Sequence, residues 1–250
     1  MRVAIVIPMH NEAAVAERCV ETVMKHCRAL PQPTTLLVVD DGSRDATGAI
    51  LQRMHVQYDH YLQYVTHPTN RGYGAALRTG MHYVIDGGYD YVIFMDSDLT
   101  NHPRYLTLFY GKMDEGWDYI KASRYIIGGA TIGVPRVHQF LSRWGNRLAH
   151  VLYGIPIHDC TNGFRAVRVA LLRAMHLQES GFPIIMEELT AAKALGASFC
   201  EVPYTLTSRG TDEGVSHLSY GPRTWRPYLR HALAAARSPY HPKAPNPSAV

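Results

Sequence analysis

Two carboxylates lie one residue apart at the point where an apolar segment of the chain ends. Asp96 and Asp98 follow the run YDYVIFM, whose composition is typical of a buried β-strand. Because burying unpaired carboxylates costs several kcal/mol, these side chains need a partner that offsets the loss of water. Mg²⁺ or Mn²⁺ is a suitable partner, since such ions bind one or two carboxylates and complete their shell with phosphate oxygens and water.

Polar groups also follow other apolar segments. A single acidic strand end is commonly a helix cap, but several of them together with an arginine indicate a shared site. A nucleoside diphosphate held through a divalent ion fits such a set, because the ion neutralises the carboxylates and polarises a departing diphosphate. The groups are His10, Asn11 and Glu12 after RVAIVIP, Asp40 and Asp41 after TTLLVV, and Ser123 with Arg124 in DYIKASRY.

The segments that must position these groups alternate between strand-like and helix-like patterns. Strands are expected at residues 2–8, 34–43, 61–67, 89–96 and 118–125, and helices at residues 12–27, 44–54, 74–85 and 103–113. This alternation, with almost continuously apolar strands, predicts an α/β protein whose parallel sheet is covered by helices on both faces. Ligands of such sheets bind beyond the carboxyl ends of the strands, where the polar groups lie.

The second half of the chain has a different pattern. Residues 126–135 are rich in glycine and predict a loop, whereas residues 136–154 predict a long helix with Arg and His on its polar side. A further helix is expected at residues 181–196, and a strand at residues 197–210. Trp144 in the long helix is expected to anchor the core.

Composition excludes several classes of protein. The chain has 250 residues, is 46% hydrophobic and carries a formal charge of +4, which describes a globular protein and does not indicate a nucleic-acid partner. The four cysteines form no C-x-x-C pair, so we expect reduced thiols, not disulfides or a zinc site. No apolar run approaches the roughly 18 residues of a membrane span. We therefore expect a soluble, cytoplasmic protein, or one peripheral at the inner face of a membrane.

Other nucleotide-binding and catalytic motifs are incomplete. NRGYGAAL has Gly72 and Gly74, but Leu77 stands where the third glycine of a dinucleotide fingerprint belongs. The chain has neither G-x-x-x-x-G-K-[ST] nor G-x-S-x-G. A nucleotidyltransferase would place a glycine-rich basic loop after the first strand, whereas this chain has PMHNEAAV.

Several motifs in order resemble those of family 2 inverting glycosyltransferases, which have the GT-A fold. They are IPMHNEA, VVDDGSRDAT, NRGYGAALRTG, FMDSDLTNHP and KASRY. Two later segments, DCTNGFRAVR and EVPYTLTSRGTDEGVSHLS, resemble those of polyprenyl-phosphate hexosyltransferases of the dolichol-phosphate mannose synthase type. The similarity covers roughly residues 3 to 220. It implies a GT-A, Rossmann-like, nucleotide-diphospho-sugar transferase fold with a mostly parallel central sheet flanked by helices.

The resemblance also implies roles for single residues and a division of the chain. We expect a GT-A catalytic domain at residues 1–210, a basic and aromatic helical segment at 211–237, and a disordered proline-rich tail at 238–250. The implied nucleotide ligands are Pro8, Asn11, Glu12, Asp40, Asp41 and Asp96; the metal ligands Asp96 and Asp98; the catalytic residues Asp98, Glu187 and Arg124; and the phosphate or acceptor ligands Thr100, Arg124, Arg136 and Arg209.

Three residues depart from the family motifs. Ile185 replaces a frequent Gln, His217 replaces the usual Lys, and Asn162 replaces the usual Ser. Each lies on the expected sugar or acceptor side, so they leave the donor sugar and the acceptor open. QFLSRW has one residue too many for the Q-x-x-R-W of processive synthases, so polymer synthesis is not expected.

The predicted reaction moves one hexose from a nucleoside diphosphate sugar, GDP-mannose or UDP-glucose, to a polyprenyl phosphate, with inversion and with Mg²⁺ or Mn²⁺ as cofactor. A soluble hydroxyl acceptor would instead need a carboxylate as base, and a non-catalytic nucleotide-sugar-binding subunit is the other alternative. To reach a lipid, the stretch with Arg223, Trp225, Arg226, Tyr228 and Arg230 would lie at a membrane interface. The alternatives are a helix packed on the domain, a membrane-anchoring partner, or a soluble acceptor.

Overall fold

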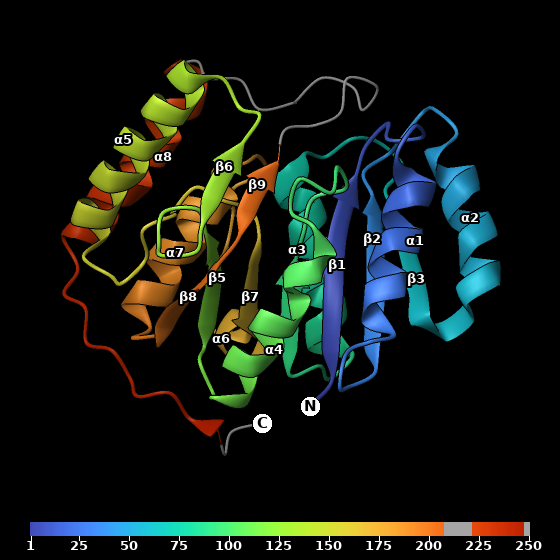
Figure 1. The fold of residues 1–250 in the computed structure, drawn as a ribbon, viewed down its shortest axis with the longest axis horizontal. Helices are drawn as coiled ribbons and strands as arrows, with labels where there is room; N and C mark the ends of the chain where they lie inside the picture. Colours follow the sequence, from blue (N-terminus) through green and yellow to red (C-terminus); the bar gives the residue numbers. More distant parts are fainter. Residues whose placement is uncertain (208–221, 248–250) are drawn as a thin grey trace.

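A seven-stranded β-sheet runs through the protein and carries helices on both faces (Figure 1). This computed structural model describes residues 1–207 and 222–247. The strands lie in the order β3-β2-β1-β4-β7-β5-β8, and the neighbours are parallel except at β7. The strands are β1 (Val3–Met9), β2 (Thr34–Asp40), β3 (Leu62–Thr66), β4 (Tyr91–Phe94), β5 (Tyr119–Ser123), β7 (Arg165–Arg168) and β8 (Phe199–Pro203).

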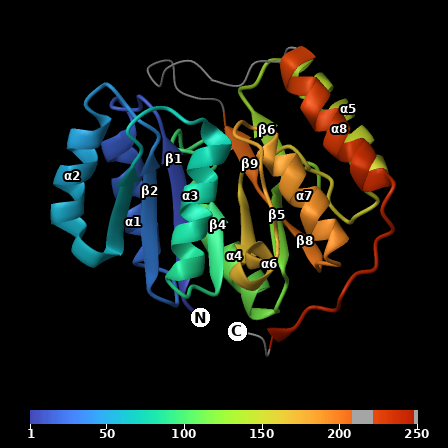
Figure 2. The ribbon, with the colours of Figure 1, turned by 180° about the vertical axis from the view of Figure 1, so that it is seen from behind.

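The helices divide between the two faces of the sheet. α1, α2 and α4 cover one face, and α3, α6 and α7 cover the other, as the front and back views show (Figure 1 and Figure 2). α5 and α8 lie side by side at the β8 end of the molecule. The helices are α1 (Ala16–Cys27), α2 (Thr47–Tyr58), α3 (Tyr73–Asp86), α4 (Leu106–Asp114), α5 (Arg136–Tyr153), α6 (Val169–Arg173), α7 (Ile184–Ala194), α8 (Pro222–Ala236), and the short η1 (Asp59–Tyr61) and η2 (Pro103–Tyr105).

The core lies on both sides of the sheet, and β1 shows why the strands are apolar throughout. Val3, Ile5 and Ile7 pack into one hydrophobic cluster, and Ala4 and Val6 pack into the other. Successive side chains of a strand point to opposite faces, so a strand covered on both faces needs an apolar residue at every position. The prediction of an α/β protein with a mostly parallel sheet is confirmed.

β7 is the antiparallel strand, and the sequence did not predict it. It has the sequence RAVR, whose arginines ordinarily lie on a protein surface. In the structure Arg165 is paired with Glu188 at 2.6 Å, and Arg168 is paired with Asp118 at 3.1 Å. These ion pairs allow two charged residues to enter the sheet, and they hide the strand from a search for apolar runs.

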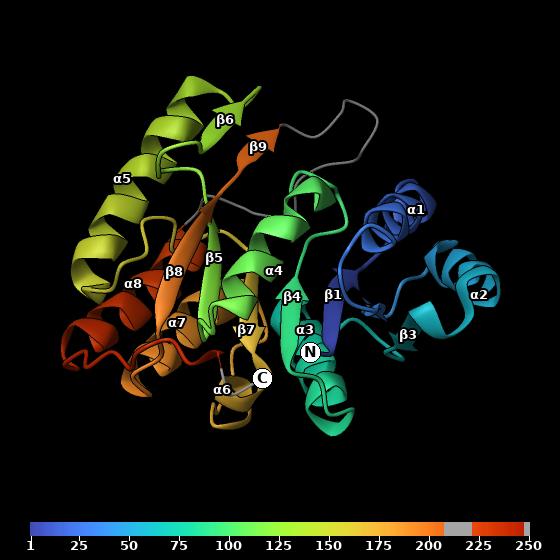
Figure 3. The ribbon, with the colours of Figure 1, turned by 60° about the horizontal axis from the view of Figure 1, so that its bottom comes forward.

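A second, two-stranded sheet forms where we predicted a glycine-rich loop. β6 (Ala130–Ile132) pairs in parallel with β9 (Thr205–Thr207). Figure 3 shows β9 continuing in the direction of β8, with β6 beside it. The segment at 126–135 is therefore partly a strand, because its backbone finds a partner 75 residues further along the chain in the register Ala130 with Thr205.

The C-terminal segment also differs from the expected disordered tail. Residues 238–247 run along the body of the protein with few apolar side chains, and backbone hydrogen bonds hold them there. Lys243 N donates to Gly196 O at 2.9 Å, and Asn246 N donates to Gly116 O at 3.0 Å. The Tyr240 hydroxyl donates to Ala197 O at 2.9 Å. Composition did not predict these contacts because their acceptors are backbone carbonyls of distant turns.

Candidate active site at the carboxyl edge of the sheet

The loops that follow β1 and β2 are tied together by hydrogen bonds. Asn11 N donates to Ser43 Oγ at 2.9 Å, and Arg44 N donates back to Asn11 Oδ1 at 2.8 Å. Glu12 N donates to Thr47 Oγ1 at 2.9 Å. Asn11 has a φ of 55°, in the left-handed region that asparagine tolerates better than most residues. The predicted nucleotide residues Asn11 and Glu12 thus lie in one cross-linked pair of loops at the edge of the sheet.

Asp41 connects this pair of loops to a third one, which follows β3. Its Oδ1 accepts hydrogen bonds from His67 Nδ1 at 2.7 Å and from Arg71 N at 2.9 Å. Its Oδ2 accepts from Gly72 N at 2.8 Å. Both oxygens of this buried carboxylate therefore hold the loop that leads into α3. We predicted that Asp41 contacts a base or ribose, and the structure adds this positioning role.

Asp40 lies at the turn itself. Its Oδ1 accepts a hydrogen bond from Ser43 N at 3.0 Å, as a side chain that closes a turn does. Between them Gly42 has a φ of 70°, and a Cβ there would lie 2.3 Å from the Thr69 carbonyl carbon. Only glycine fits such a close approach of two backbones. Pro8, also predicted here, lies in β1 and pairs with β2 one residue before Asp40.

Asp96 is held on both sides after the end of β4. Its Oδ1 accepts a hydrogen bond from the Tyr73 hydroxyl at 3.0 Å, and its Oδ2 accepts from Asn101 Nδ2 at 3.0 Å. Burial and the charge of Asp96 raise the pKa of Tyr73, so its hydroxyl stays a donor. The Tyr73 ring stacks on Phe182 at 4.5 Å between centroids. A Cβ at Gly163 would lie 3.1 Å from Asp96 Oδ2, so a glycine there lets its loop approach the carboxylate closely.

Asp98 stabilises the turn that follows Asp96. Its Oδ1 accepts hydrogen bonds from Thr100 N at 3.0 Å and from the Thr100 hydroxyl at 2.8 Å. Burial raises the pKa of the nearby Cys19 thiol, and the negative charges of Asp98, Glu12 and Asp96 raise it further. Carboxylates from the ends of β1 and β4 therefore act on the same point of α1. The shared site that the strand ends indicate stays a prediction.

The Asp96 and Asp98 pair also fits a divalent ion. In residues 1–207 and 222–247 no group of three or more His, Cys, Asp or Glu side chains could hold a metal by itself. Mg²⁺ and Mn²⁺ at nucleotide sites ordinarily take only one or two carboxylates, and phosphate and water supply the remaining ligands. Asn101 Oδ1 is buried and accepts no hydrogen bond in the described part of the chain. A carboxylate pair beside an unsatisfied amide oxygen is an oxygen-rich donor set that suits a hard cation.

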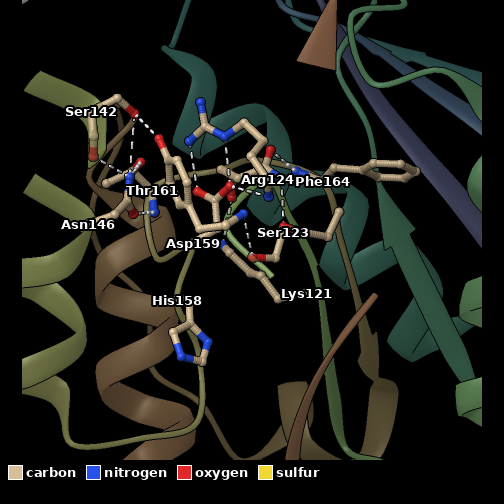
Figure 4. A network of polar contacts seen from close by, with 12 residues as sticks. Lys121, Ser123, Arg124, Ser142, Asn146, His158, Asp159, Thr161 and Phe164 are labelled. Atoms are coloured by element: carbon tan, nitrogen blue, oxygen red, sulfur yellow. Dashed lines mark hydrogen bonds and ion pairs between the residues drawn. The ribbon is translucent and has the colours of Figure 1, made fainter. Parts of the chain in front are cut away.

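Arg124, predicted to bind phosphate, is paired with Asp159 (Figure 4). Its Nε and Nη2 donate to the two oxygens of Asp159, each at 2.7 Å, and its backbone N donates to Oδ2 at 3.1 Å. Burial lowers the pKa of Arg124, but Asp159 more than offsets this and raises it above its ordinary value. The guanidinium is permanently charged and held in one orientation, with its fork occupied by Asp159.

The segment at 159–163 is fastened to β5 and α5 by the same network (Figure 4). Lys121 Nζ donates to Asn162 O at 2.6 Å from within β5. Burial and the charge of Arg165 lower the pKa of Lys121 to about 7. On the α5 side, Thr161 N donates to Asn146 Oδ1 and Asn146 Nδ2 donates to Thr161 Oγ1, both at 3.0 Å. These contacts hold the segment so that Gly163 lies close to the Asp96 carboxylate, which follows β4.

Glu187, predicted to be catalytic, holds another loop of the site. Its carboxylate accepts hydrogen bonds from Gln178 N at 3.0 Å and from Glu179 N at 2.9 Å. The next residue of this loop, Ser180, accepts from Gly74 N at 2.7 Å at the start of α3. Both oxygens of Glu187 are engaged by backbone amides, which favours a positioning role for this residue over a role as base.

The other predicted residues include some that the structure describes and some that it does not. Arg136 is exposed at the first residue of α5, after β6. Arg209 and His217 lie outside the described residues. Ile185 is buried in the core. The Asn162 amide donates to Ala122 O at 2.8 Å, so the amide that departs from the usual Ser supports the backbone of β5.

Sequence reasoning missed four contributors to the site: Tyr73, Asn101, Asp159 and Gly163. Each lies inside a motif that the sequence made visible, namely NRGYGAAL, FMDSDLTNHP or DCTNGFR. Motif order could therefore have selected them. Which carboxylate oxygen each one contacts depends on how distant segments meet.

Comparison with known proteins identifies the family of this chain. The profile of glycosyl transferase family 2 matches residues 4–175. The polyprenol monophosphomannose synthase of Mycolicibacterium smegmatis is 34% identical over 222 residues, which cover 87% of this chain and 81% of that protein. The undecaprenyl-phosphate mannosyltransferase of Micrococcus luteus is 31% identical over 226 residues, which cover 88% of this chain and 89% of that protein.

Among solved structures, the glucosyl-3-phosphoglycerate synthase of Mycobacterium tuberculosis, in complex with Mn²⁺, uridine diphosphate and glucosyl-3-phosphoglycerate, superposes with a TM-score of 0.66. The match covers 95% of this chain and 81% of that chain at 20% identity, and it supports the GT-A fold. The chain belongs to glycosyl transferase family 2.

Proposed function

We propose that this protein transfers one hexose, with mannose favoured, from a nucleoside diphosphate sugar to a polyprenyl phosphate and inverts the anomeric carbon. The observation that carries the proposal is the carboxylate pair of Asp96 and Asp98 at the end of β4, held by Tyr73, Asn101 and Thr100. The names of two relatives, a polyprenol monophosphomannose synthase and an undecaprenyl-phosphate mannosyltransferase, support the acceptor class and the sugar. The glucosyl transferase structure, at 20% identity, supports only the fold.

The donor side needs fixed carboxylates. A Mg²⁺ or Mn²⁺ ion bound by Asp96 and Asp98 would neutralise the diphosphate and polarise it as a leaving group. Hydrogen bonds from Tyr73 and Asn101 orient Asp96, and those from Thr100 orient Asp98. Such partners of ligating groups prevent the carboxylates from rotating away from the diphosphate.

The acceptor needs no strong base. A phosphate monoester has a second pKa near 6, so most of it is already a dianion at neutral pH. One of its oxygens forms the new bond to the anomeric carbon while the carbon–oxygen bond to the diphosphate breaks and its electron pair leaves with the nucleoside diphosphate. Attack opposite the leaving group inverts the carbon. Because the acceptor phosphate carries no proton that must be removed, Glu187 need not act as a base. Its carboxylate can therefore accept hydrogen bonds from backbone amides, as it does in the structure.

The phosphate-binding arginines remain part of the proposal. Arg124 lies at the end of β5, and two of its guanidinium nitrogens donate to Asp159. We therefore expect it to act on the diphosphate through its fixed positive charge and not through a two-bond contact from these nitrogens. Arg136 is exposed at the start of α5. We assign Arg136 and Arg209 to the phosphate of the acceptor and Arg124 to the field around the diphosphate. The catalytic domain in this proposal spans residues 1–210.

Isothermal titration with GDP, UDP, GDP-mannose and UDP-glucose, each with and without Mn²⁺, tests the donor. We expect one nucleotide to bind well only with the metal, and to bind weakly to an Asp98→Ala variant. Transfer is then measured by mass spectrometry with a short, water-soluble prenyl phosphate as acceptor. The matching prenol, which lacks the phosphate, should yield no product. Equal transfer to the prenol, or no binding of any of these nucleotides, would contradict the proposal.

A further inference from the structure

α5 exposes a row of large apolar side chains along one side. The row contains Trp144, which we predicted to be a core anchor; that prediction is wrong, since 56% of Trp144 is exposed. Apart from the adjacent Phe140 and Leu141, successive members are three or four residues apart, which places the row on one face of a helix. The opposite face carries the buried Asn146, Ala149 and Tyr153. The exposed row consists of Val137, Phe140, Leu141, Trp144, Leu148 and Val151.

α8 adds a second row that touches the first. Trp225, Leu229 and Leu233 are exposed at four-residue spacing. The Trp225 ring lies against α5, because a Cβ at Gly145 would come within 2.9 Å of it. Between the helices is an apolar hollow of about 50 Å³, lined in part by Leu148 and Leu229. We call the two rows together the α5–α8 face. An exposed apolar surface that extends over two helices is a common mark of an interaction site.

The two helices of this face contribute positive but no negative side chains. The sequences of α5 and α8 contain no Asp or Glu. Arg143 and Arg147 are exposed, and each is two residues from Gly145, so a rotation of about 100° per residue places them on the side of α5 away from α8. Exposed Arg226 and Arg230 lie four residues apart on α8.

One carboxylate from outside the two helices reaches this face. Glu179, in the loop before α7, forms an ion pair with Arg230 and lies 2.9 Å from His231. The other exposed arginines of the two helices, which flank the apolar rows on both sides, give the face its cationic rim.

We propose that the α5–α8 face seats the protein on an anionic lipid bilayer, with its apolar rows in the interface and its arginines at the head groups. The inference rests on the proposed function, whose acceptor is a membrane lipid. None of the helices in the described part of the chain is long and apolar enough to cross a membrane. A second copy of the chain fits the face less well, because it would bring arginine against arginine without any carboxylate on either helix.

The orientation of the face suits the proposed reaction. Both helices start at the edge of the molecule toward which β1 and the other parallel strands point (Figure 1). Arg136 is the first residue of α5, so a cationic group stands where the face meets this edge. A lipid phosphate near this end of the face would thus lie toward the edge of the sheet that carries the strand-end carboxylates.

Co-sedimentation with vesicles tests the inference separately from sugar transfer. The vesicles contain phosphatidylcholine with or without phosphatidylglycerol, and no polyprenyl phosphate. We expect the wild-type protein to bind the anionic vesicles and to be released by salt. Trp144→Glu and Leu229→Glu should each weaken partitioning by about tenfold or more, since each buries a charge in the interface. Arg147→Glu should weaken binding to anionic vesicles only.

Matched controls lie at the other end of the sheet. Val56 on α2 is 79% exposed, so Val56→Glu makes the same change on an unrelated helix and should leave binding intact. Arg28→Glu controls for loss of a surface arginine. All variants should keep the wild-type unfolding midpoint and the wild-type rate with the water-soluble acceptor. If the proposed function fails, the wild-type protein will not transfer sugar to the water-soluble acceptor. If only the docking inference fails, the wild-type protein will keep this activity but will not bind the vesicles through the α5–α8 face.

Tryptophan fluorescence identifies the surface that enters the lipid. A protein that retains only Trp144, made with Trp117→Phe and Trp225→Phe, should shift its emission to the blue and be quenched by brominated lipids. A protein that retains only Trp117, which donates to Glu115 at 2.8 Å, should show neither change. Equal quenching of both, binding unaffected by Trp144→Glu, or a concentration-dependent dimer that Trp144→Glu abolishes would overturn the inference.

Discussion

The side chains at the two ends of this molecule have opposite environments. At the end formed by β3, β2, β1 and β4, the polar groups of the strand ends are hydrogen-bonded to neighbouring loops, as Asp41 is to His67, Arg71 and Gly72. At the end formed by α5 and α8, large apolar groups such as Trp144 and Leu148 are left exposed. In the first arrangement, hydrogen bonds hold the polar atoms in defined positions. The second presents exposed apolar area and positive charge.

In the two proposals above, this contrast corresponds to two kinds of ligand. A diphosphate and its metal require carboxylate oxygens at defined positions, and hydrogen-bond donors orient both oxygens of Asp96 and Oδ1 of Asp98. A bilayer surface is fluid and has no unique atomic position, so apolar area and positive charge are sufficient. The segment at 159–163 lies between these regions, since Gly163 approaches Asp96 and Thr161 bonds to Asn146 of α5.

The largest effect is expected at the carboxylates of the first end. Asp98→Ala should lower kcat by about 10³-fold with Mn²⁺ present, since a bound metal supplies several kcal/mol of charge stabilisation. Asp86→Ala, on the exposed end of α3, is the control and should keep the wild-type rate. A near-native rate for Asp98→Ala under saturating Mn²⁺ would remove the metal assignment.

The next effect concerns stability of the segment between the two ends. Asp159→Ala leaves the Arg124 guanidinium, only 11% exposed, without its counter-charge, and should lower the free energy of unfolding by about 3 to 5 kcal/mol. Glu17→Ala breaks the exposed pair with Arg53 and should cost about 1 kcal/mol or less. Urea unfolding measures both values. Similar losses for the two variants would show that the buried pair does not hold this segment.

A smaller effect tests whether Asp96 is oriented by its neighbour. Tyr73→Phe keeps the ring on Phe182 but removes the hydroxyl from Asp96 Oδ1, and should weaken the apparent affinity for Mn²⁺ by about 10- to 100-fold. The metal dependence of the transfer rate measures this affinity, and excess Mn²⁺ should restore much of kcat. Tyr83→Phe, elsewhere on α3, is the control. An unchanged metal dependence for Tyr73→Phe would mean that Asp96 needs no donor.

The smallest effect is a slope of stability with pH from Lys121. Its pKa is lowered from 10.5 to about 7, so between these values the unfolded chain binds a proton that the folded protein lacks. Stability from this group therefore rises as the pH increases from 7 toward 10. The free energy of unfolding of wild type, minus that of Lys121→Met, should rise across this range in urea titrations. Parallel curves for the two proteins would show that Lys121 stays charged in the fold.

Sequence patterns predicted most of the first end, because the information there is local. Apolar runs mark β1, β2 and β4, and polar residues directly after them lie at one edge of any parallel sheet. The rest of the molecule was harder to predict. β7 was missed because Arg165 and Arg168 lie in the sheet beside partners at Glu188 and Asp118. The roles of Glu187 and Arg124 were predicted as catalytic, and the structure shows their polar atoms engaged by a loop and by Asp159.

The amino-acid sequence by itself determined the alternation of strands and helices, the family motifs and the position of Asp96 and Asp98 at a strand end, because each depends on residues that are neighbours in the chain. The tertiary structure decided which donor holds each carboxylate oxygen and which side of α5 is buried. Trp144 shows why: its helix has apolar residues on two sides, and only the packing of α8 and the core against one of them leaves the other in solvent. Such choices depend on contacts between distant segments, which periodicity does not contain.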